Sequence, residues 1–216
     1  MAATPGYVKN NALGTYTASG SCVLAFPTDV SANYICITQV VITDANPTVT
    51  WPTGFNQIIS LSEGGSFHAA VAWKRMDGSE SSTTSAVTFS LASTGSIRSS
   101  FYSGVLIVDN PIEASAALQG TSTNVSGAAF TTLGNNRLGL GLSFYRRNVG
   151  TTPPAGWTEQ QDAGGLPHYT LDVLGIASPT TMPVVTRGPI TSSEWITLRM
   201  ALLPNDSKAR NFCVMV

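Results

Sequence analysis

Short apolar runs separated by clusters of Gly, Pro, Asn and Ser fill the chain, and helical periodicity is almost absent. Runs bounded by such turn-forming residues predict β-strands. The expected strands are 21–26, 34–43, 55–61, 67–76, 86–91, 96–108, 125–130, 137–146, 157–161, 168–174, 182–186 and 194–203. One short helix is expected at 112–118, with Asn110 as its N-cap and Pro111 at its first position. The pattern predicts an all-β protein.

Two short motifs occur twice, about one hundred residues apart. Residues 52–55 (PTGF) recur as 154–157 (PAGW), an offset of 102, and residues 64–68 (GGSFH) recur as 164–168 (GGLPH), an offset of 100. Asn33 matches Asn136 at a similar spacing. Two copies are too few for a solenoid. The repeat predicts a jelly-roll-like antiparallel β-sandwich with an internal pseudo-twofold repeat, or else two small sandwiches in tandem.

A single sandwich is preferred because each half has few large apolar residues with which to build a separate core. We expect an N-terminal arm at 1–20, a β-sandwich at 21–203 with half-repeats 21–110 and 122–203, and a C-terminal tail at 204–216.

Each Pro-x-Gly-aromatic motif is expected to form a type II turn, with proline second and glycine third. The aromatic residue that follows, Phe55 or Trp157, would begin a strand and fill the end of the sandwich. Stacking of these rings on a sugar is the alternative, and the structural role is favoured because the aromatic residue recurs in both halves.

Charged residues make up only 11% of the 216 residues, against about 25% in typical globular chains. The net charge is −1, and 50 residues are Ser or Thr, so neutral hydroxyls must cover much of the surface. Without a basic cluster, a nucleic-acid partner is not expected. No apolar stretch approaches the length of a membrane span, so no membrane partner is expected either.

Cys22, Cys36 and Cys213 lie in apolar contexts and lack the spacing of metal ligands, so they are interpreted as buried thiols. The N-terminal residues show neither the basic region nor the apolar run of a signal peptide. We therefore expect synthesis in a cytoplasm.

Sequence motifs of catalysis are not found: GxSxG, HExxH, the phosphate-binding GxxxxGK[ST] and a helix-opening GxGxxG are all missing. Dispersed acids leave a glycan hydrolase as a remote alternative; they are Glu63, Glu159, Asp162 and Asp172. We expect a protein that is not an enzyme and that has no catalytic residue, cofactor or metal.

The only histidines, His68 and His168, occupy the same position in the two halves. A metal site or a pH sensor is one interpretation of such a pair. An imidazole hydrogen-bonded to a neighbouring turn is preferred, because no second His or carboxylate lies at i+2 or i+4 from His68 to complete a ligand set.

Candidate partner-binding residues lie on the expected arm, at one turn, at one strand end and in the tail. They are Tyr7, Tyr16, Trp51, Arg146, Arg147, Phe212, Val214 and Val216. The arginine pair would contact an acidic partner surface, with a solvated turn as the alternative. An apolar tail needs cover from its own core or from a partner, so the tail is a candidate for an added strand on a neighbouring subunit.

A series of these motifs resembles a β-sandwich module of tailed-bacteriophage virion proteins. The motifs are 52–55 (PTGF), the two glycines at 64–65, the strand ending in Trp73 and Lys74, 101–105 (FYSGV), Asp109 and 111–113 (PIE), and then the second copy at 154–157. The resemblance covers residues 20–203. The chain departs from the family at Phe55, where Trp is usual, and at 31–33, where a Gly-Asp pair is missing.

The resemblance implies a noncatalytic virion protein. Because heptads and Gly-X-Y repeats of a fibre shaft are lacking, the expected function is capsid decoration, or cement: binding the major capsid protein on the capsid surface and stabilising the shell. A homo-oligomer is expected, with a trimer as one option. The alternative is a tail or head fibre module that binds a host receptor or glycan through Trp51 and the loop tips.

Overall fold

The computed structural model of the chain describes residues 5–123, 125–132, 134–146, 156–161, 168–171, 181–182, 185–187 and 193–205. These residues form β-strands and no helix, which confirms the expected all-β class. The first half contains β1 (Gly6–Asn10), β2 (Gly14–Ala25), β3 (Ile35–Ile42), β4 (Val49–Thr50), β5 (Asn56–Glu63), β6 (Phe67–Arg75) and β7 (Thr84–Ser103). The second half contains β8 (Ile112–Ser122), β9 (Val125–Gly127), β10 (Phe130–Thr131), β11 (Leu138–Tyr145), β12 (Trp157–Gln161), β13 (His168–Leu171), β14 (Thr181–Met182), β15 (Val185–Arg187) and β16 (Ser193–Leu202).

The two halves repeat one strand order. In the first half the strands pair in the order β5-β6-β3-β7-β1, and in the second half in the order β12-β13-β11-β16-β8, all antiparallel. Asn33 and Asn136, which match in the sequence repeat, both have positive φ, 68° and 59°, two residues before β3 and β11. Positive φ on a non-glycine residue is uncommon, so this match supports the internal repeat.

The Pro-x-Gly turns differ in one detail from the expectation. Gly54 and Gly156 have positive φ, 88° and 82°, as a third turn position requires. The Phe55 amide donates to the carbonyl of Pro52 at 3.2 Å, which makes Pro52 the first residue of the turn and Thr53 the second. Placing the proline second was wrong, because one residue separates it from the glycine.

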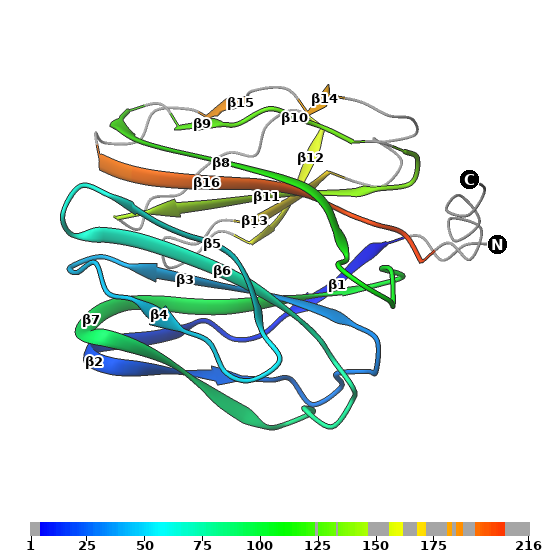
Figure 1. Ribbon diagram of the computed structural model, residues 1–216, viewed down its shortest axis with the longest axis horizontal. Helices are drawn as coiled ribbons and strands as arrows, with labels where there is room; N and C mark the ends of the chain where they lie inside the picture. The colour runs from blue at the N-terminus through cyan, green and yellow to red at the C-terminus, as the bar shows by residue number, and fades with distance from the viewer. Residues whose placement is uncertain are drawn as a thin grey trace, which may run out of the picture.

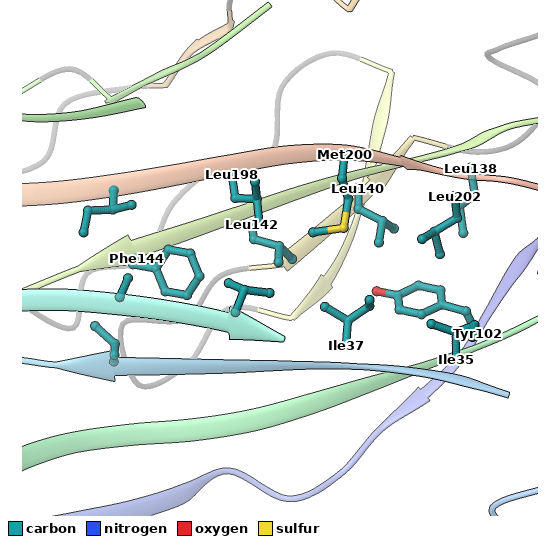
Figure 2. Packing of buried hydrophobic residues seen from close by; sticks show 14 of the residues in the cluster. Ile35, Ile37, Tyr102, Leu138, Leu140, Leu142, Phe144, Leu198, Met200 and Leu202 are labelled. Atoms are coloured by element: carbon teal, nitrogen blue, oxygen red, sulfur yellow. The ribbon is translucent and has the colours of Figure 1, made fainter. Parts of the chain in front are cut away.

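The largest hydrophobic cluster lies between the two five-stranded paths (Figure 2). β3 contributes Ile35 and Ile37, β7 contributes Tyr102, and the facing strands β11 and β16 contribute alternate leucines such as Leu140 and Leu198. Alternation follows from the two-residue period of a strand, which sends every second side chain to one face. Burial between two sheets is the defining feature of a β-sandwich.

A second hydrophobic cluster lies on the other side of the first sheet. The long β7 pairs with β3 along its second part and with β2 and β4 along its first part, so the chain folds back over the sheet. Leu24, Val87 and Phe101 are buried in this second cluster. In Figure 1, β2, β4 and the first part of β7 form the lowest layer, and β9, β10, β14 and β15 form the uppermost one. The first half therefore has a second core of its own, which the expectation of a single sandwich did not include.

The helix expected at 112–118 is wrong. These residues belong to β8, which pairs with β16 from Leu202↔Ile112 to Ser193↔Ser122. Asn110 Oδ1 accepts a hydrogen bond from the Ile112 amide at 3.0 Å, which closes a turn before a strand instead of capping a helix. Pairing along β16 outweighs the helix propensity of the alanines.

The N-terminal arm expected at 1–20 is not a separate segment in the described residues. β1 pairs with β7 from Gly6↔Ser103 to Asn10↔Ser100, and β2 begins at Gly14. At the other end, Pro204 bridges Val105 and the Asn205 amide donates to the Gly104 carbonyl at 2.8 Å. The rest of the expected tail, 206–216, lies outside the described residues.

Candidate functional site

The outer layer of the first half presents one uncharged β-surface, which we call the outer face. It consists of alternate exposed residues of β2, β4 and β7: Ser21, Val23, Ala25, Thr50, Thr84, Ala86, Thr88 and Ser90. Cross-strand pairs Val23↔Ala86 and Ser21↔Thr88 place these side chains side by side. The intervening residues, such as Leu24 and Val87, point into the second hydrophobic cluster.

The sequence segments that build this layer contain no charged residues. Residues 10–28, 45–62 and 81–97 contain no Asp, Glu, Lys or Arg. Val23 is 63% exposed, and Leu91, next to the outer face on β7, is 55% exposed. Broad β-surfaces that carry apolar and hydroxyl side chains without charge lose little solvation when another protein covers them.

The two arm tyrosines are not exposed on an arm. Tyr16 is 8% exposed, lies in the second hydrophobic cluster, and donates a 2.9 Å hydrogen bond to the Val41 carbonyl. Tyr7 is half-buried beside Tyr102, with ring centroids 6.1 Å apart and planes at 67°. Burial raises the pKa of both tyrosines. The prediction that Tyr16 is a partner contact is corrected: its hydroxyl and ring are already satisfied within the fold.

Trp51 is half-buried instead of projecting from its turn. Its ring stacks on Phe55 at a centroid distance of 5.8 Å, and its Nε1 donates to Gln57 Oε1 at 3.1 Å. Lys74 Nζ lies over the Phe55 ring, 6.0 Å from its centroid. Both rings pack against the second hydrophobic cluster, the arrangement expected of aromatic residues that fill one end of the sandwich.

Arg146 forms an ion pair with Glu194, its Nη1 lying 2.6 Å from Oε1. The Arg146 amide also donates to the Glu194 carbonyl at 3.2 Å, which continues the β11–β16 pairing by one step. The guanidinium is therefore engaged with a residue of its own chain. Arg147, Phe212, Val214 and Val216, the other candidate partner contacts, lie outside the described residues.

A polar cluster surrounds the imidazole of His68 on the same side of the sheet as the second core. Ser60 Oγ lies 3.0 Å from His68 Nε2, and Ser62 Oγ and Asn46 Oδ1 lie 2.9 and 3.0 Å from Nδ1. The β5–β6 pairing places Ser62 opposite His68, and Ser60, two residues earlier on the same face of β5, also reaches the ring. Asn46 comes from the loop after β3. The preferred interpretation of His68, an imidazole bonded to a neighbouring turn or strand, agrees with these contacts.

His68 is 4% exposed, and burial lowers the pKa of its ring. The ring is held neutral and oriented by partners on both nitrogens. The side chain of His168, its repeat counterpart, lies outside the described residues. No sequence motif links His68 to Ser60 and Asn46. The two glycines at 64–65 are the one usable signal, because a hairpin turn there places Ser62 opposite His68.

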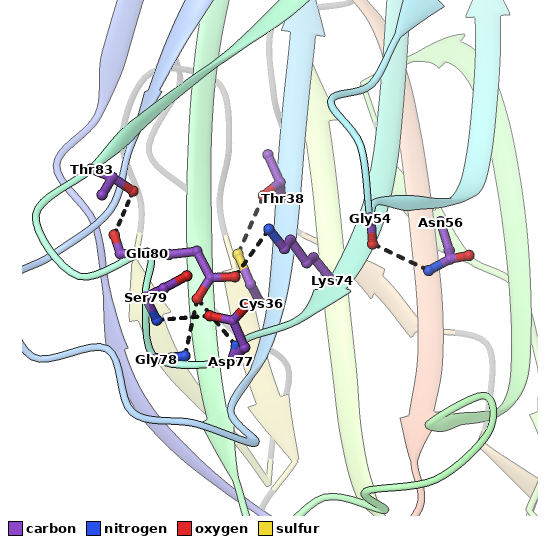
Figure 3. Close-up of polar contacts among 10 residues, drawn as sticks. All are labelled: Cys36, Thr38, Gly54, Asn56, Lys74, Asp77, Gly78, Ser79, Glu80 and Thr83. Carbon is purple, nitrogen blue, oxygen red and sulfur yellow. Dashed lines mark hydrogen bonds and ion pairs between the residues drawn. The ribbon is translucent and has the colours of Figure 1, made fainter.

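Glu80 anchors the loop between β6 and β7 (Figure 3). It is 6% exposed, accepts hydrogen bonds from the amides of Asp77 and Gly78 at 3.1 Å each, and pairs with Lys74 at 3.0 Å. Two backbone amides and the Lys74 ammonium compensate the charge of this buried carboxylate, so Glu80 acts as a structural anchor of the loop. Cys36 lies nearby, its Sγ 3.5 Å from Thr38 Oγ1.

Cys22 and Cys36 are free and buried, as predicted, and burial raises the pKa of Cys22 to about 12 and of Cys36 to about 11. Within the described residues, no three His, Cys, Asp or Glu side chains are grouped to hold a metal ion. Nor does this part of the chain contain a helix able to cross a bilayer. Comparisons with family models, curated proteins and solved structures found no match to this chain.

Proposed function

We propose that this chain is a noncatalytic structural protein of a bacteriophage virion, a decoration protein that binds the major capsid protein and stabilises the shell. The observation that carries the proposal is the outer face: an uncharged β-surface on which Val23 is exposed, with Leu91 beside it. The motif resemblance between residues 52 and 157 supports the virion context.

The outer face suits a stable interface with another protein better than permanent exposure to solvent. Soluble proteins commonly protect exposed β-edges with charged side chains, especially lysine. Here the three strands of the layer carry hydroxyl, alanine and valine side chains instead. A capsid surface would cover such a face without stripping water from buried charges.

Cryo-electron microscopy of the particle tests the proposal. Density for the sandwich over every capsomer supports decoration, with the outer face toward the shell. Density confined to a tail or to one vertex would instead establish the fibre module as the correct assignment. Density nowhere on the particle would refute both.

A matched pair of variants tests the face itself. Val23→Glu places a charge within the outer face, whereas Leu118→Glu places the same charge on β8, where Leu118 is 40% exposed. Capsid binding measured by co-sedimentation should fall at least tenfold for Val23→Glu and remain unchanged for Leu118→Glu. Equal binding by both variants would show that the outer face is not the interface.

A further inference from the structure

Ser60, His68 and Asn46 form a hydrogen-bonded relay. Asn46 Oδ1 can only accept a hydrogen bond, and it lies 3.0 Å from His68 Nδ1, so the ring proton resides on Nδ1. Nε2 then carries the free lone pair, and it accepts the hydroxyl proton of Ser60 across 3.0 Å. Nucleophile, base and orienting group follow one another in the order that activates a serine.

The surroundings differ between the two ends of the relay. His68 is buried, and its low pKa keeps Nε2 unprotonated and able to take a proton near neutral pH. Ser60 is exposed, on the strand β5. A β-bulge between Gln57 and Ile59 directly precedes Ser60, and bulges commonly re-aim the side chains next to them.

β5 is the outermost strand of its sheet, with β6 as its partner among the described strands. An edge strand leaves alternate backbone N–H groups without a strand partner. Backbone N–H groups beside a nucleophile are the donors that stabilise the oxyanion formed during acyl transfer. Among the described strands, the outer edge of β5 has no strand partner, so it offers access for a substrate and is where such donors would come from.

We propose that Ser60 is an acyl-accepting serine that reacts with carboxylic esters presented at the outer edge of β5. Ser60 Oγ attacks the ester carbonyl carbon while its proton passes to His68 Nε2. The carbon–oxygen bond to the leaving alcohol then breaks, and Nε2 returns the proton to that alcohol. The products are the Ser60 ester and the free alcohol, and His68 ends neutral, as it began. The acylation is a single stoichiometric step that ends at the Ser60 ester, without turnover, so it is independent of the proposed noncatalytic virion role.

Ser62 is the natural control within the same cluster. Its Oγ also contacts the ring, at 2.9 Å, but at Nδ1, which carries the proton. Ser62 in turn donates its own hydroxyl to Asn46 Oδ1. Its proton therefore has no route to the basic nitrogen, and Ser62 should stay unreactive.

The test uses the folded full-length chain with a fluorophosphonate and with p-nitrophenyl acetate, followed by intact-mass measurement and peptide mapping. One adduct on Ser60 is expected, lost in Ser60→Ala and retained within twofold in the matched Ser115→Ala, which removes an exposed strand serine of β8 outside the His68 cluster. An adduct elsewhere, or no adduct on the folded wild-type chain, would overturn the proposal.

Asn46→Asp gives a second readout that does not depend on removing the buried histidine. A carboxylate at position 46 stabilises the imidazolium that forms during attack, so the acylation rate of Ser60 should rise at least about tenfold. Asn46 is exposed, so the substitution should leave folding intact. A rate unchanged by Asn46→Asp would show that His68 does not serve as the base.

Discussion

Gly95 of β7 lies against the carbonyl oxygen of Val41 in β3, so closely that a Cβ at position 95 would stand 1.9 Å from that oxygen. The same carbonyl accepts the hydroxyl of Tyr16, whose oxygen would be 2.7 Å from the added Cβ. Glycine at 95 thus makes room for the hydrogen bond that ties β2 to the central strand β3 across β7.

Gly95→Ala should destabilise the protein by more than about 3 kcal/mol, because neither the Val41 backbone nor the buried Tyr16 ring can move away without loss of packing. Thermal unfolding should show a midpoint lowered by roughly 6–12 °C. Gly20→Ala is the matched control, since a Cβ at position 20 of β2 meets nothing within 4 Å. Equal midpoints for the two variants would contradict the close packing at Gly95.

Strand positions and the repeat could be predicted because they depend on local pattern. Short apolar runs bounded by turn-forming residues identify β3 and β11, and the turn chemistry of Gly54 and Gly156 requires the positive φ that both adopt. Residues 112–118 were mistaken for a helix because propensity is local, whereas their strand partner, β16, lies some eighty residues away. The sequence carries no local signal of that pairing.

The N-terminal strands were missed for a related reason. Residues 6–20 are rich in Gly, Thr, Ser and Ala, so their apolar alternation is weak, and only pairing with β7 reveals their place in the sheet. Ser60 and His68 could be related through a hairpin register, but Asn46 could not, because it comes from a loop that tertiary folding brings to the ring. The sequence therefore identifies His68 as a candidate site residue but does not reveal its hydrogen-bond partners.

Acid should destabilise the protein through His68. Burial lowers the pKa of this ring in the folded state below its ordinary value of about 6.5, so the unfolded chain binds the proton more readily. The free energy of unfolding should be insensitive to this group above about pH 6.5 and should fall as the pH decreases below it. Urea titrations at a series of pH values measure this dependence.

The paired variants His68→Gln and His168→Gln separate the two histidines. His68→Gln should remove most of the loss of stability just below pH 6.5 while retaining a polar side chain near Ser60 and Ser62. If His68→Gln leaves the pH profile as steep as in the wild type, His68 is not the group responsible.

Glu80→Ala should destabilise the protein by about 2–4 kcal/mol, because it removes a buried acceptor from two amides and leaves Lys74 without its counterion. Glu80→Gln keeps one acceptor oxygen and should cost less. Asp29→Ala breaks the ion pair with Lys9 at a largely exposed carboxylate, so chemical denaturation should detect little change. A larger effect at Asp29 than at Glu80 would reverse the assignment of Glu80 as the structural anchor.

Cys22 and Cys36 should resist thiol reagents until the protein unfolds. With pKa values of about 12 and about 11, fewer than roughly one thiol in a thousand is thiolate at pH 8, and both sulfurs are buried. In a Cys213→Ser background, Ellman's reagent should titrate two thiols in denaturant and react with the native protein only at the rate at which it opens. Gly95→Ala should accelerate that reaction, since it lowers the free energy of unfolding. Rapid titration of either thiol in the native wild-type fold would contradict the closed second hydrophobic cluster.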